Sequence, residues 1–284
     1  MSTAVIGPLT GGTAILADRV TLALGNPDRL GVAFSGGVDS SEQLALAARA
    51  HGPTRTQAIL GVSPSLASDE RTAAHQVSAS IGVPLIELET HEGDNAEYRA
   101  NGPDRCFHCK DELFTRISDE VADRYSLSAI AYGENADDAR RPDRPGSQAA
   151  TNHRVLRPLA DAGLDKAAVR EVARALGLAS ADKPAAPCLA SRIPHFQEVT
   201  PEKLRQIDKA ESAVRALGFS DARVRHHGEV ARLELPVADL PHAVSEGMRG
   251  HLLKAVRSAG FRFVSLDLAG IQSGAFTLPL VTRA

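Results

Sequence analysis

The chain contains no tryptophan, and aromatic residues make up only 4% of its 284 positions. Proteins that hold single-stranded nucleic acids need aromatic side chains on which the bases stack, so this scarcity argues against an extended surface of that kind. The net charge of −3 and the pI near 6.4 likewise argue against general binding to phosphate backbones. We therefore do not expect a nucleic acid as the partner.

Long hydrophobic runs are also missing. No apolar segment reaches the length that crosses a bilayer, and residues 1–20 lack the basic start and apolar core of a signal peptide. The hydrophobic content of 43% and the charged content of 24% are those of an ordinary globular protein. These features predict a soluble, cytoplasmic protein with no membrane partner, large enough for one large domain and one smaller domain.

Cysteine is scarce as well, since the chain has only Cys106, Cys109 and Cys188. Three cysteines do not make a disulfide framework, and in a reducing compartment they indicate metal binding or catalysis. A structural zinc site would need His108 or His195 as its fourth ligand, whereas a redox C-x-x-C would use the first two cysteines alone. An iron–sulfur cluster would use all three and leave one iron for a non-protein ligand. The residues alone leave these interpretations open, together with a fourth in which the cysteines are unrelated buried side chains.

The clearest motif is a loop of serine and glycine between an expected strand at 30–34 and an expected helix at 41–50. Its sequence is Ser35-Gly36-Gly37-Val38-Asp39-Ser40, followed by Ser41. The glycines allow the main chain to approach a ligand closely. The N–H groups of the loop and of the first helical turn then point at one place, where the helix dipole favours an anion.

This loop is a predicted phosphate site of an uncommon kind. It lacks the lysine that ends a Walker A loop, and its glycines do not follow the dinucleotide G-x-G-x-x-G pattern. Ser35, Ser40 and Ser41 can add hydroxyl donors, and Asp39 can hold a Mg²⁺ that bridges phosphate oxygens. The alternative is an ordinary glycine turn between a strand and a helix.

Strand and helix patterns alternate through the first half of the chain. Expected strands lie at 30–34, 56–62, 83–88 and 127–132, and expected helices lie at 41–50, 67–81 and 104–125. This order predicts an α/β fold with a doubly wound parallel sheet, in which ligands bind at the carboxyl ends of the strands. Residues 135–151 are rich in Asp, Arg, Pro and Gly, which predicts a loop beside that end. A further amphipathic helix is expected at 165–176, with Asp165 as its N-cap.

A smaller unit is expected to begin near Thr200, which has the features of a helix N-cap and is followed by Pro201 at the first helical position. Further strands are expected at 222–226, 230–235 and 261–268, and a further helix at 242–259. We therefore predict two domains: residues 1–195, which carry the nucleotide site, and residues 196–284, which form a small α+β domain.

The loop at 35–40 resembles the pyrophosphate-binding loop, or PP-loop, of the ATP-pyrophosphatase superfamily. Three further stretches, at 132–138, 182–194 and 223–228, are similar to motifs of the LarE family, the ATP-dependent sulfur transferases that make the nickel-pincer cofactor of lactate racemase. The resemblance runs from about residue 30 to residue 276, and the stretch around Pro187, Cys188 and Pro194 is its most specific part. Glu134 departs from the pattern, since a less acidic residue is expected there.

The resemblance implies a reaction and its cofactors. A carboxylate of pyridinium-3,5-biscarboxylic acid mononucleotide attacks the α-phosphate of MgATP, pyrophosphate leaves, and a sulfur nucleophile then displaces AMP to give a thiocarboxylate. Some family members have only the cysteine that matches Cys188, and it gives up its own sulfur. Others also carry a C-x-x-C and hold a [4Fe–4S] cluster. Because this chain has Cys106 and Cys109 as well, the resemblance implies the cluster type, with a replaceable sulfide on the open iron and an outside sulfide source.

The resemblance also assigns roles to individual residues. The loop residues 35–41 and Gly133 are expected to bind ATP, and Asp39 is expected to act in catalysis through Mg²⁺. Cys188 is the expected catalytic sulfur site and a ligand of the cluster. Apart from the resemblance, the closeness of Arg192 to Cys188 in the sequence indicates that its charge lowers the thiol pKa and promotes sulfur ligation or attack.

In the second domain, Glu211, Arg223 and Arg225 match family positions that hold a phosphate or a metal near the cysteine. Arginine suits this role because its planar fork binds phosphate oxygens through two hydrogen bonds. On the sequence alone, the two arginines would be read as alternation on an exposed strand. Family members form symmetric oligomers, so a homo-oligomer is expected.

Three other functions compete with this interpretation. A tRNA thiolase of the same superfamily would also combine the loop with cysteines, but the acidic pI and the few aromatic residues argue against it. An ammonia-dependent synthetase needs no cysteine, so Cys188 would be silent to mutation. A nucleotide-sensing protein with a zinc-bound helix would have no turnover.

Overall fold

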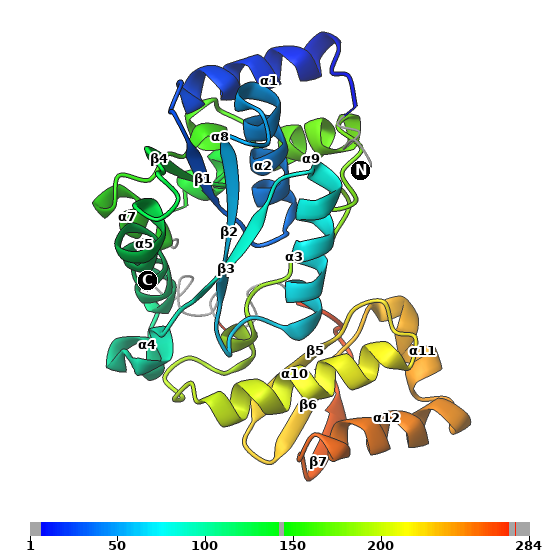
Figure 1. Cartoon of the computed structure of the whole chain (residues 1–284). Coiled ribbons are helices and arrows are strands. Elements are labelled where there is room, and N and C mark those ends of the chain that lie inside the picture. The colour runs from blue at the N-terminus through cyan, green and yellow to red at the C-terminus, as the bar shows by residue number, and fades with distance from the viewer. Residues whose placement is uncertain (1–6, 142–144, 273–275, 277–284) are drawn as a thin grey trace. The chain divides into compact units, whose positions relative to one another are not determined.

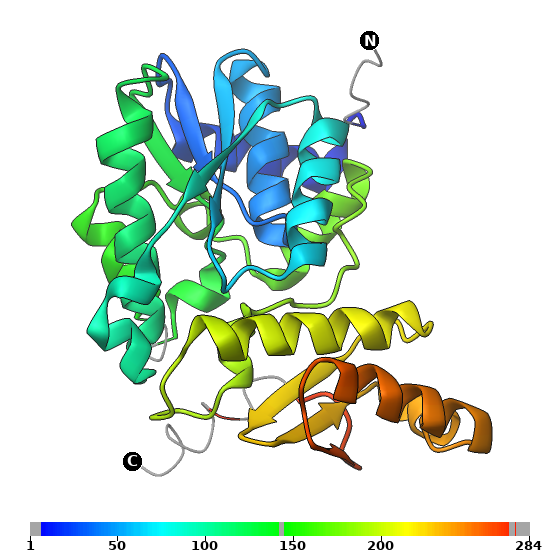
Figure 2. The same ribbon diagram turned by 60° about the horizontal axis from the view of Figure 1, so that its bottom comes forward.

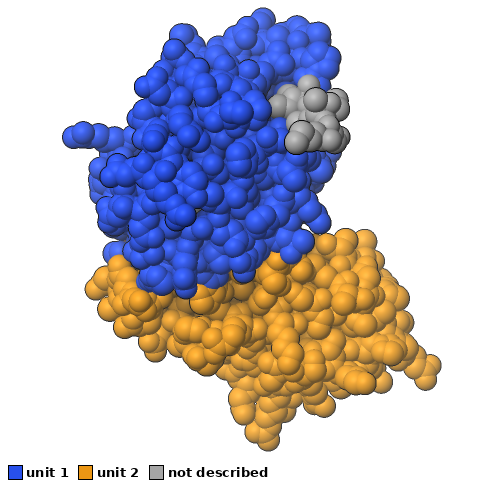
Figure 3. Space-filling view, in the orientation of Figure 1, with its two compact units in different colours: residues 1–63, 70–92, 106–186 blue, residues 64–69, 93–105, 187–284 orange. Residues whose placement is uncertain are grey.

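The computed structural model of the chain describes residues 7–141, 145–272 and 276. The chain divides into two compact units, one made of residues 1–63, 70–92 and 106–186 and the other of residues 64–69, 93–105 and 187–284 (Figure 3). Each unit therefore combines segments that are distant in the sequence. No helix in the described part of the chain is both long enough and apolar enough to span a bilayer.

A four-stranded parallel sheet forms the centre of the first unit (Figure 1). Its strands, in the order β3-β2-β1-β4, are β1 (Leu30–Ala33), β2 (Thr56–Val62), β3 (Leu85–Glu89) and β4 (Ala129–Tyr132). Val32 lies opposite Ala58 on one side and opposite Ala131 on the other. Leu156 adds a parallel bridge to Ala131. The predicted α/β fold with a parallel sheet is confirmed.

The strand order places a switch point between β1 and β4. The chain passes from β1 to β2 and β3 on one side, and β4 then pairs with the other edge of β1. In sheets of this kind, connections that leave neighbouring strands in opposite directions open a crevice at the carboxyl ends, where ligands bind. The segments that follow β1 and β4 are therefore the place to look for the site.

Helices cover both faces of this sheet. On one face α2 (Val38–His51) packs on β1 and β2, and α1 (Gly11–Leu24) and α9 (Lys166–Ala175) pack against α2. On the other face, Phe114 and Ile117 join Ile59 and Tyr132 in a buried apolar core. These two side chains come from α5 (Arg105–Arg116) and from the π-helical turn η2 (Ile117–Ala122) that follows it. The connection between β2 and β3 contains α3 (Ser68–Ile81).

The first unit differs from the prediction mainly after β4. Residues 135–151 were predicted as a loop, but they contain α6 (Ala136–Ala139) and α7 (Gly146–Asn152), so this prediction is wrong for those stretches. The side chain of Asn135 caps α6 by accepting a hydrogen bond from the N–H of Asp138 at 2.9 Å. The predicted N-cap of α9 is confirmed, because Asp165 accepts a hydrogen bond from the N–H of Ala168 at 2.8 Å.

The second unit contains a three-stranded sheet of β5 (Arg223–His227), β6 (Val230–Glu234) and β7 (Phe263–Leu266). β5 and β6 are antiparallel, and β7 is parallel to β6. Helices α10 (Pro201–Ala216) and α12 (Glu246–Ser258) pack together on one face (Figure 2), where Val214, Val224, Leu233 and Val256 are buried in one core. The helix predicted at 242–259 is divided into α11 (Leu240–Ala243) and α12.

Thr200 caps α10 as predicted, since its hydroxyl accepts a hydrogen bond from the N–H of Lys203 at 3.4 Å. Short helical elements complete the two units. They are η1 (Glu92–Asp94), α4 (Ala96–Ala100), α8 (Pro158–Asp161), η3 (Leu189–Arg192) and η4 (Val237–Asp239).

Candidate active site

The serine and glycine loop leads directly from β1 into α2 (Figure 1). Gly36 has a φ of +74°, and a Cβ at this position would lie 2.9 Å from the Cα of Ala74, so both the conformation and the space require glycine. The helix begins at Val38, and Asp39 lies in its first turn. The first N–H groups of a helix have no partner within the helix and favour an anion, so the loop has the construction of a phosphate site.

The serines of the loop hold its shape. Ser40 Oγ accepts a hydrogen bond from the N–H of Ser35 at 3.2 Å and donates one to the carbonyl of Gly37 at 3.1 Å. The Ser35 and Ser40 hydroxyl oxygens lie 3.2 Å apart. Ser41 is fully buried, and its hydroxyl has no hydrogen-bond partner among the described residues. Ser35 and Ser40 are thus engaged in closing the loop.

Gly133 follows β4 and lies against the start of α2. A Cβ on Gly133 would lie 2.7 Å from both the carbonyl carbon of Asp39 and the backbone nitrogen of Ser40. These are main-chain atoms, which cannot move aside without shifting the helix start. Gly133 therefore allows the ends of β1 and β4 to build one site.

We expect Gly133→Ala to weaken ATP binding about tenfold or more, because the added methyl group displaces the first turn of α2 by overpacking. Equilibrium dialysis with ATP measures the effect. Gly12→Ala is the matched control, since a Cβ at Gly12 meets nothing within 4 Å. Equal affinities of the Gly133 and Gly12 variants would contradict this role.

Asp39 is held by two side chains from distant parts of the chain. Lys166 Nζ, at the start of α9, lies 2.5 Å from Asp39 Oδ2. Asn135 Nδ2 donates a hydrogen bond to Asp39 Oδ1 at 3.0 Å and another to Asp138 Oδ2 at 3.2 Å. The carboxylate that the sequence assigns to Mg²⁺ is thus positioned by a cation and an amide.

Glu42 lies one turn further along α2 and is fully buried. Neither of its carboxyl oxygens has a hydrogen-bond partner among the described residues. Burial, with the charge of Asp39 adding to it and that of Lys166 opposing it, raises the pKa of Glu42 to about 9. Glu42 is therefore an uncharged acid at neutral pH.

This buried acid makes stability depend on pH. The native state holds the Glu42 proton up to about pH 9, whereas the unfolded chain releases it near 4.5. The native state therefore binds more protons in that window, and the stability of the wild type falls as the pH rises through it. We expect Glu42→Gln to remove this loss, which is at most about 1.4 kcal/mol per pH unit. Urea unfolding of both proteins at about pH 5 and about pH 8 measures this loss. An equal change in the free energy of unfolding between the two pH values for wild type and Glu42→Gln would contradict the prediction.

In the second unit, Cys188 is exposed at the start of η3. The N–H of Leu189 donates a hydrogen bond to the carbonyl of Ser65 at 2.9 Å, which anchors this start. Arg192, at the end of η3, donates from Nη1 to the carbonyls of Pro187 at 2.6 Å and Cys188 at 3.3 Å. The guanidinium group therefore fixes the backbone that carries the thiol.

Arg192 and Glu211 form a buried ion pair. Arg192 is only 3% exposed and Glu211 only 1%. Two hydrogen bonds join them, from Nε to Oε1 at 2.9 Å and from Nη2 to Oε2 at 3.1 Å. Burial lowers the pKa of Arg192, but Glu211 outweighs it and the net pKa is raised. Glu211 Oε1 also accepts the N–H of Val224 at 2.8 Å, which links α10 to β5.

Arg225 makes a second pair of this kind with Glu234. Its Nε and Nη2 donate to the two carboxylate oxygens at 2.9 and 2.7 Å, and Glu234 is fully buried. Arg225 Nη1 also donates to the carbonyl of Ser191 at 3.1 Å. Arg232 joins the network through Glu234 at 3.1 Å and Asp267 at 3.6 Å. Arg192 and Arg225 both donate hydrogen bonds to carbonyl groups in or next to η3. Each of them is therefore held in position by a buried glutamate.

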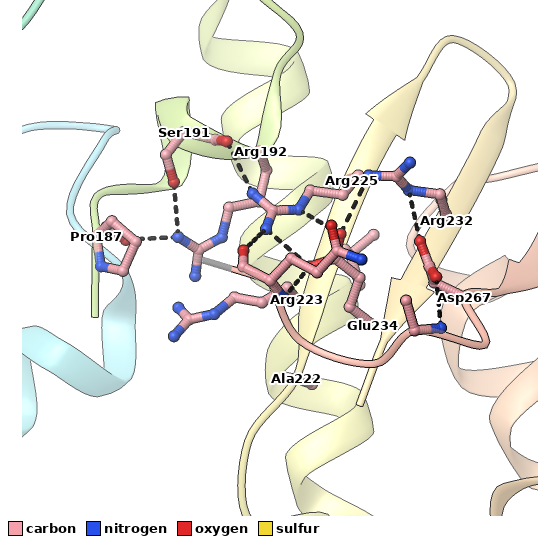
Figure 4. A network of polar contacts seen from close by, with 12 residues as sticks. Pro187, Ser191, Arg192, Ala222, Arg223, Arg225, Arg232, Glu234 and Asp267 are labelled. Atoms are coloured by element: carbon pink, nitrogen blue, oxygen red, sulfur yellow. Dashed lines mark hydrogen bonds and ion pairs between the residues drawn. The ribbon is translucent and has the colours of Figure 1, made fainter. Parts of the chain in front are cut away.

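Arg223 belongs to the same group of cations (Figure 4). It is 6% exposed, and its Nη2 lies 3.4 Å from Asp221 Oδ2. Burial lowers the pKa of Arg223, and the neighbouring charge of Arg192 lowers it further, against the opposite effect of Asp221 and Glu211. Arginines crowded in this way favour an anion beside them. The alternative interpretation, alternation on an exposed strand, is wrong, since β5 is buried over four of its five residues.

A buried asparagine ties another segment of the second unit to the residues that follow η3. Asn101 Nδ2 donates to the carbonyls of Ile193, Pro194 and Gln197, at 3.2, 2.8 and 3.1 Å. Arg105 Nη1 donates to the side-chain oxygen of Asn101 and to the carbonyl of Ala190 at 3.0 Å. The residue just before Cys106 is thus bonded to the residue two positions after Cys188.

The C-x-x-C lies on α5, where Cys106 is exposed and Cys109 is half-buried. Their spacing of three residues puts both thiols on one side of the helix. Cys106 and Cys109 belong to the first unit, and Cys188 belongs to the second. Within the described residues no disulfide involves these cysteines, and no three His, Cys, Asp or Glu side chains are grouped so as to hold a metal ion.

Sequence reasoning missed several residues of this site. Lys166 gave no signal, because it lies 127 residues from Asp39. Asn135 was noticed within a motif but received no role. Glu234 was interpreted only as part of an expected strand, and Asn101 received no interpretation.

Comparisons with known proteins agree with this geometry. A family model described as asparagine synthase matches residues 13–131. An uncharacterized protein of Synechocystis is 39% identical over 250 residues, which cover 88% of this chain and 92% of that protein. The pyridinium-3,5-bisthiocarboxylic acid mononucleotide synthase of Lactiplantibacillus plantarum is 31% identical over 252 residues, which cover 89% of this chain and 90% of that protein. An uncharacterized protein of Methanocaldococcus jannaschii is 26% identical over 239 residues, or 84% of this chain and 88% of that protein.

The parallel sheet with its phosphate loop at the β1–β4 switch point defines a PP-loop ATP-pyrophosphatase. The L. plantarum synthase is similar along nearly the whole chain, so the family can be stated more closely. The chain belongs to the LarE family of ATP-dependent sulfurtransferases.

Proposed function

We propose that this protein adenylates a carboxylate of pyridinium-3,5-biscarboxylic acid mononucleotide and converts it into a thiocarboxylate. The observation that carries the proposal is an exposed thiol, Cys188, on a backbone held by the buried Arg192, in a chain that also has a PP-loop. The name of the L. plantarum relative, which specifies a bisthiocarboxylic acid mononucleotide, supports the choice of substrate.

The reaction balances in two steps. A carboxylate oxygen of the substrate attacks the α-phosphorus of ATP, the bond to the β-phosphate oxygen breaks, and pyrophosphate leaves with that electron pair. Hydrosulfide sulfur then attacks the activated carbonyl carbon, the bond to the AMP oxygen breaks, and AMP and a proton are released. Both steps need anions held close together, so the protein must supply positive charge and backbone donors.

In the first unit, the N–H groups after β1 and at the start of α2 are the proposed binding site of the departing pyrophosphate. Asp39 is the proposed ligand of Mg²⁺, oriented by the amide of Asn135 at 3.0 Å. Gly133 keeps the backbone at this point open to close approach. These residues orient the phosphates and leave the substrate carboxylate to act as the nucleophile.

In the second unit, Arg223 and Arg225 are the proposed binding site for the phosphate of the mononucleotide. Two hydrogen bonds to Glu234 hold the Arg225 side chain in one conformation. It therefore loses little further conformational entropy when an anion binds. Arg192 and Glu211 fix η3 and therefore the position of the Cys188 backbone. In this proposal the substrate is bound through its phosphate, and the sulfur site has a fixed backbone.

We also propose that Cys106, Cys109 and Cys188 hold a [4Fe–4S] cluster. The donor set fits, since three thiols outside any disulfide are present in the described chain, two of them exposed and one half-buried. Such a cluster, when bound, supplies inorganic sulfide as the nucleophile. Iron and acid-labile sulfide in wild type, both lost in Cys106→Ala, support it, and their absence from wild type after anaerobic reconstitution overturns it.

Dicarboxylate-dependent release of pyrophosphate tests the proposed function. Wild type is incubated with MgATP, with and without the dicarboxylate mononucleotide, and pyrophosphate is counted. We expect release only with the dicarboxylate. Release that instead requires ammonia or a tRNA would overturn the proposal in favour of a synthetase or a tRNA thiolase.

A further inference from the structure

Arginine side chains hold the backbone of η3 through its carbonyl groups. Arg192 and Arg225 do so from the ion pairs described above (Figure 4). A third arginine, Arg105, is 7% exposed, and its Nη1 donates to the carbonyl of Ala190 at 3.0 Å. Ala190 lies two residues after Cys188, and Arg105 belongs to the same compact unit as both. The proposed reaction gives Arg105 no part, although it binds the element at whose start the thiol lies.

Asn101 holds the Arg105 side chain in place. Its side-chain oxygen accepts a hydrogen bond from the same Nη1. Asn101 is fully buried and has a φ of +56°, a left-handed conformation that asparagine tolerates better than most residues. Its backbone N–H donates to the carbonyl of Tyr98 at 3.1 Å, where α4 ends. Arg105 therefore has a fixed partner on its own segment of the chain.

Asn101 also holds the chain that leaves η3. Its amide group binds three carbonyls between residues 193 and 197. Its own carbonyl accepts the N–H of Phe196 at 3.1 Å and the ring N–H of His195 at 3.0 Å. Phe196 has a φ of +65°, which a bulky side chain rarely adopts, so this turn depends on those bonds. Arg105 and Asn101 together therefore fix η3 and the residues that follow it.

We propose that Arg105 and Asn101 are positioning residues for sulfur transfer, which keep η3 where the Cys188 sulfur site meets the activated carbonyl carbon. The inference rests on the proposed function in taking Cys188 as the sulfur site. A displacement of about 1 Å at a reacting group costs on the order of a hundredfold in rate. The proposed adenylation uses the phosphate loop of the other unit, so we expect that step to continue when η3 shifts.

Loss of this positioning should separate the two steps of the reaction. An adenylate that sulfur does not reach is left to water, whose oxygen attacks the same carbonyl carbon. The bond to the AMP oxygen then breaks, AMP and protons are released, and the dicarboxylate is restored. Pyrophosphate therefore forms without an equal amount of thiocarboxylate. The ratio of thiocarboxylate to pyrophosphate reports positioning, because partial unfolding would lower both products together.

Single-turnover reactions measure this ratio for wild type, Arg105→Met and Arg105→Lys, reconstituted anaerobically and matched in acid-labile sulfide content. We expect Arg105→Met to release pyrophosphate at close to the wild-type rate but to form thiocarboxylate about tenfold or more slowly. Arg105→Lys retains a charged donor without the planar fork, so it should recover part of the ratio.

Two further variants complete the test. Asn101→Gly should lower the ratio as Arg105→Met does, because glycine keeps the positive φ and removes only the side chain. Arg99→Met is the matched control, since Arg99 Nη1 binds the carbonyls of Gly93 and Asp94, at 3.1 and 2.9 Å, and its ratio should be that of wild type. An unchanged ratio in Arg105→Met and Asn101→Gly, or an equal loss of both products, overturns the inference alone. Wild type that releases no pyrophosphate with the dicarboxylate overturns the proposed function as well.

Discussion

Cys188→Ser protein is expected to release pyrophosphate in the presence of the dicarboxylate but to form no thiocarboxylate. Cys188 is exposed, so the substitution removes no core packing. The phosphate loop and the residues that hold Asp39 lie in the other unit and are unchanged. Activation therefore continues while sulfur transfer stops, and mass spectrometry of the mononucleotide should show a loss of at least about a thousandfold, as for other essential nucleophiles.

The cysteines of α5 provide the matched comparison. If a cluster on three cysteines delivers sulfide, Cys106→Ala and Cys109→Ala should each abolish repeated turnover. If Cys188 instead gives up its own sulfur, both variants still form up to one thiocarboxylate per chain. Thiocarboxylate formation by Cys188→Ser at the wild-type level would contradict any role for this thiol.

Glu211→Gln is expected to destabilise the second unit by about 3–5 kcal/mol, because it leaves the Arg192 guanidinium buried without its counter-charge. Glu211 is 1% exposed and binds Arg192 through two hydrogen bonds. It also accepts the N–H of Val224, so its loss loosens the link between α10 and β5. Urea unfolding followed by circular dichroism measures the change.

Arg205→Ala is the control on the same helix. Arg205 pairs with Glu202 at 2.9 Å, but both side chains are mostly exposed, so no measurable change in stability is expected. A double variant, Arg192→Met with Glu211→Met, should be more stable than Glu211→Gln because no buried charge remains. If Glu211→Gln unfolds at the wild-type midpoint, the buried pair does not hold this unit together.

The phosphate loop could be predicted from sequence because its signal is local. Glycine at position 36 is needed for a positive φ and for the close approach of Ala74, and the loop's serines bond within six residues of one another. The caps at Asp165 and Thr200 were predictable for the same reason, since each accepts an N–H only three residues away.

Contacts between distant segments could not be predicted in this way. Lys166 meets Asp39 only because α9 packs on α2. Arg225 looked like a polar residue on a strand, and its buried partner Glu234 emerged only from the pairing of β5 with β6. The helices at 136–139 and 146–152 were missed because their composition is that of a loop, and the cap by Asn135 was not recognised.

The central claim is the replacement of a carboxylate oxygen by sulfur at the expense of ATP. Anaerobically reconstituted wild type, with MgATP, the dicarboxylate mononucleotide and a sulfide source, is the sample, and the product is analysed by mass spectrometry. The account predicts a thiocarboxylate mononucleotide, with AMP and pyrophosphate formed in equal amounts. An unchanged dicarboxylate under these conditions, or an amide in its place when ammonia is added, would contradict it.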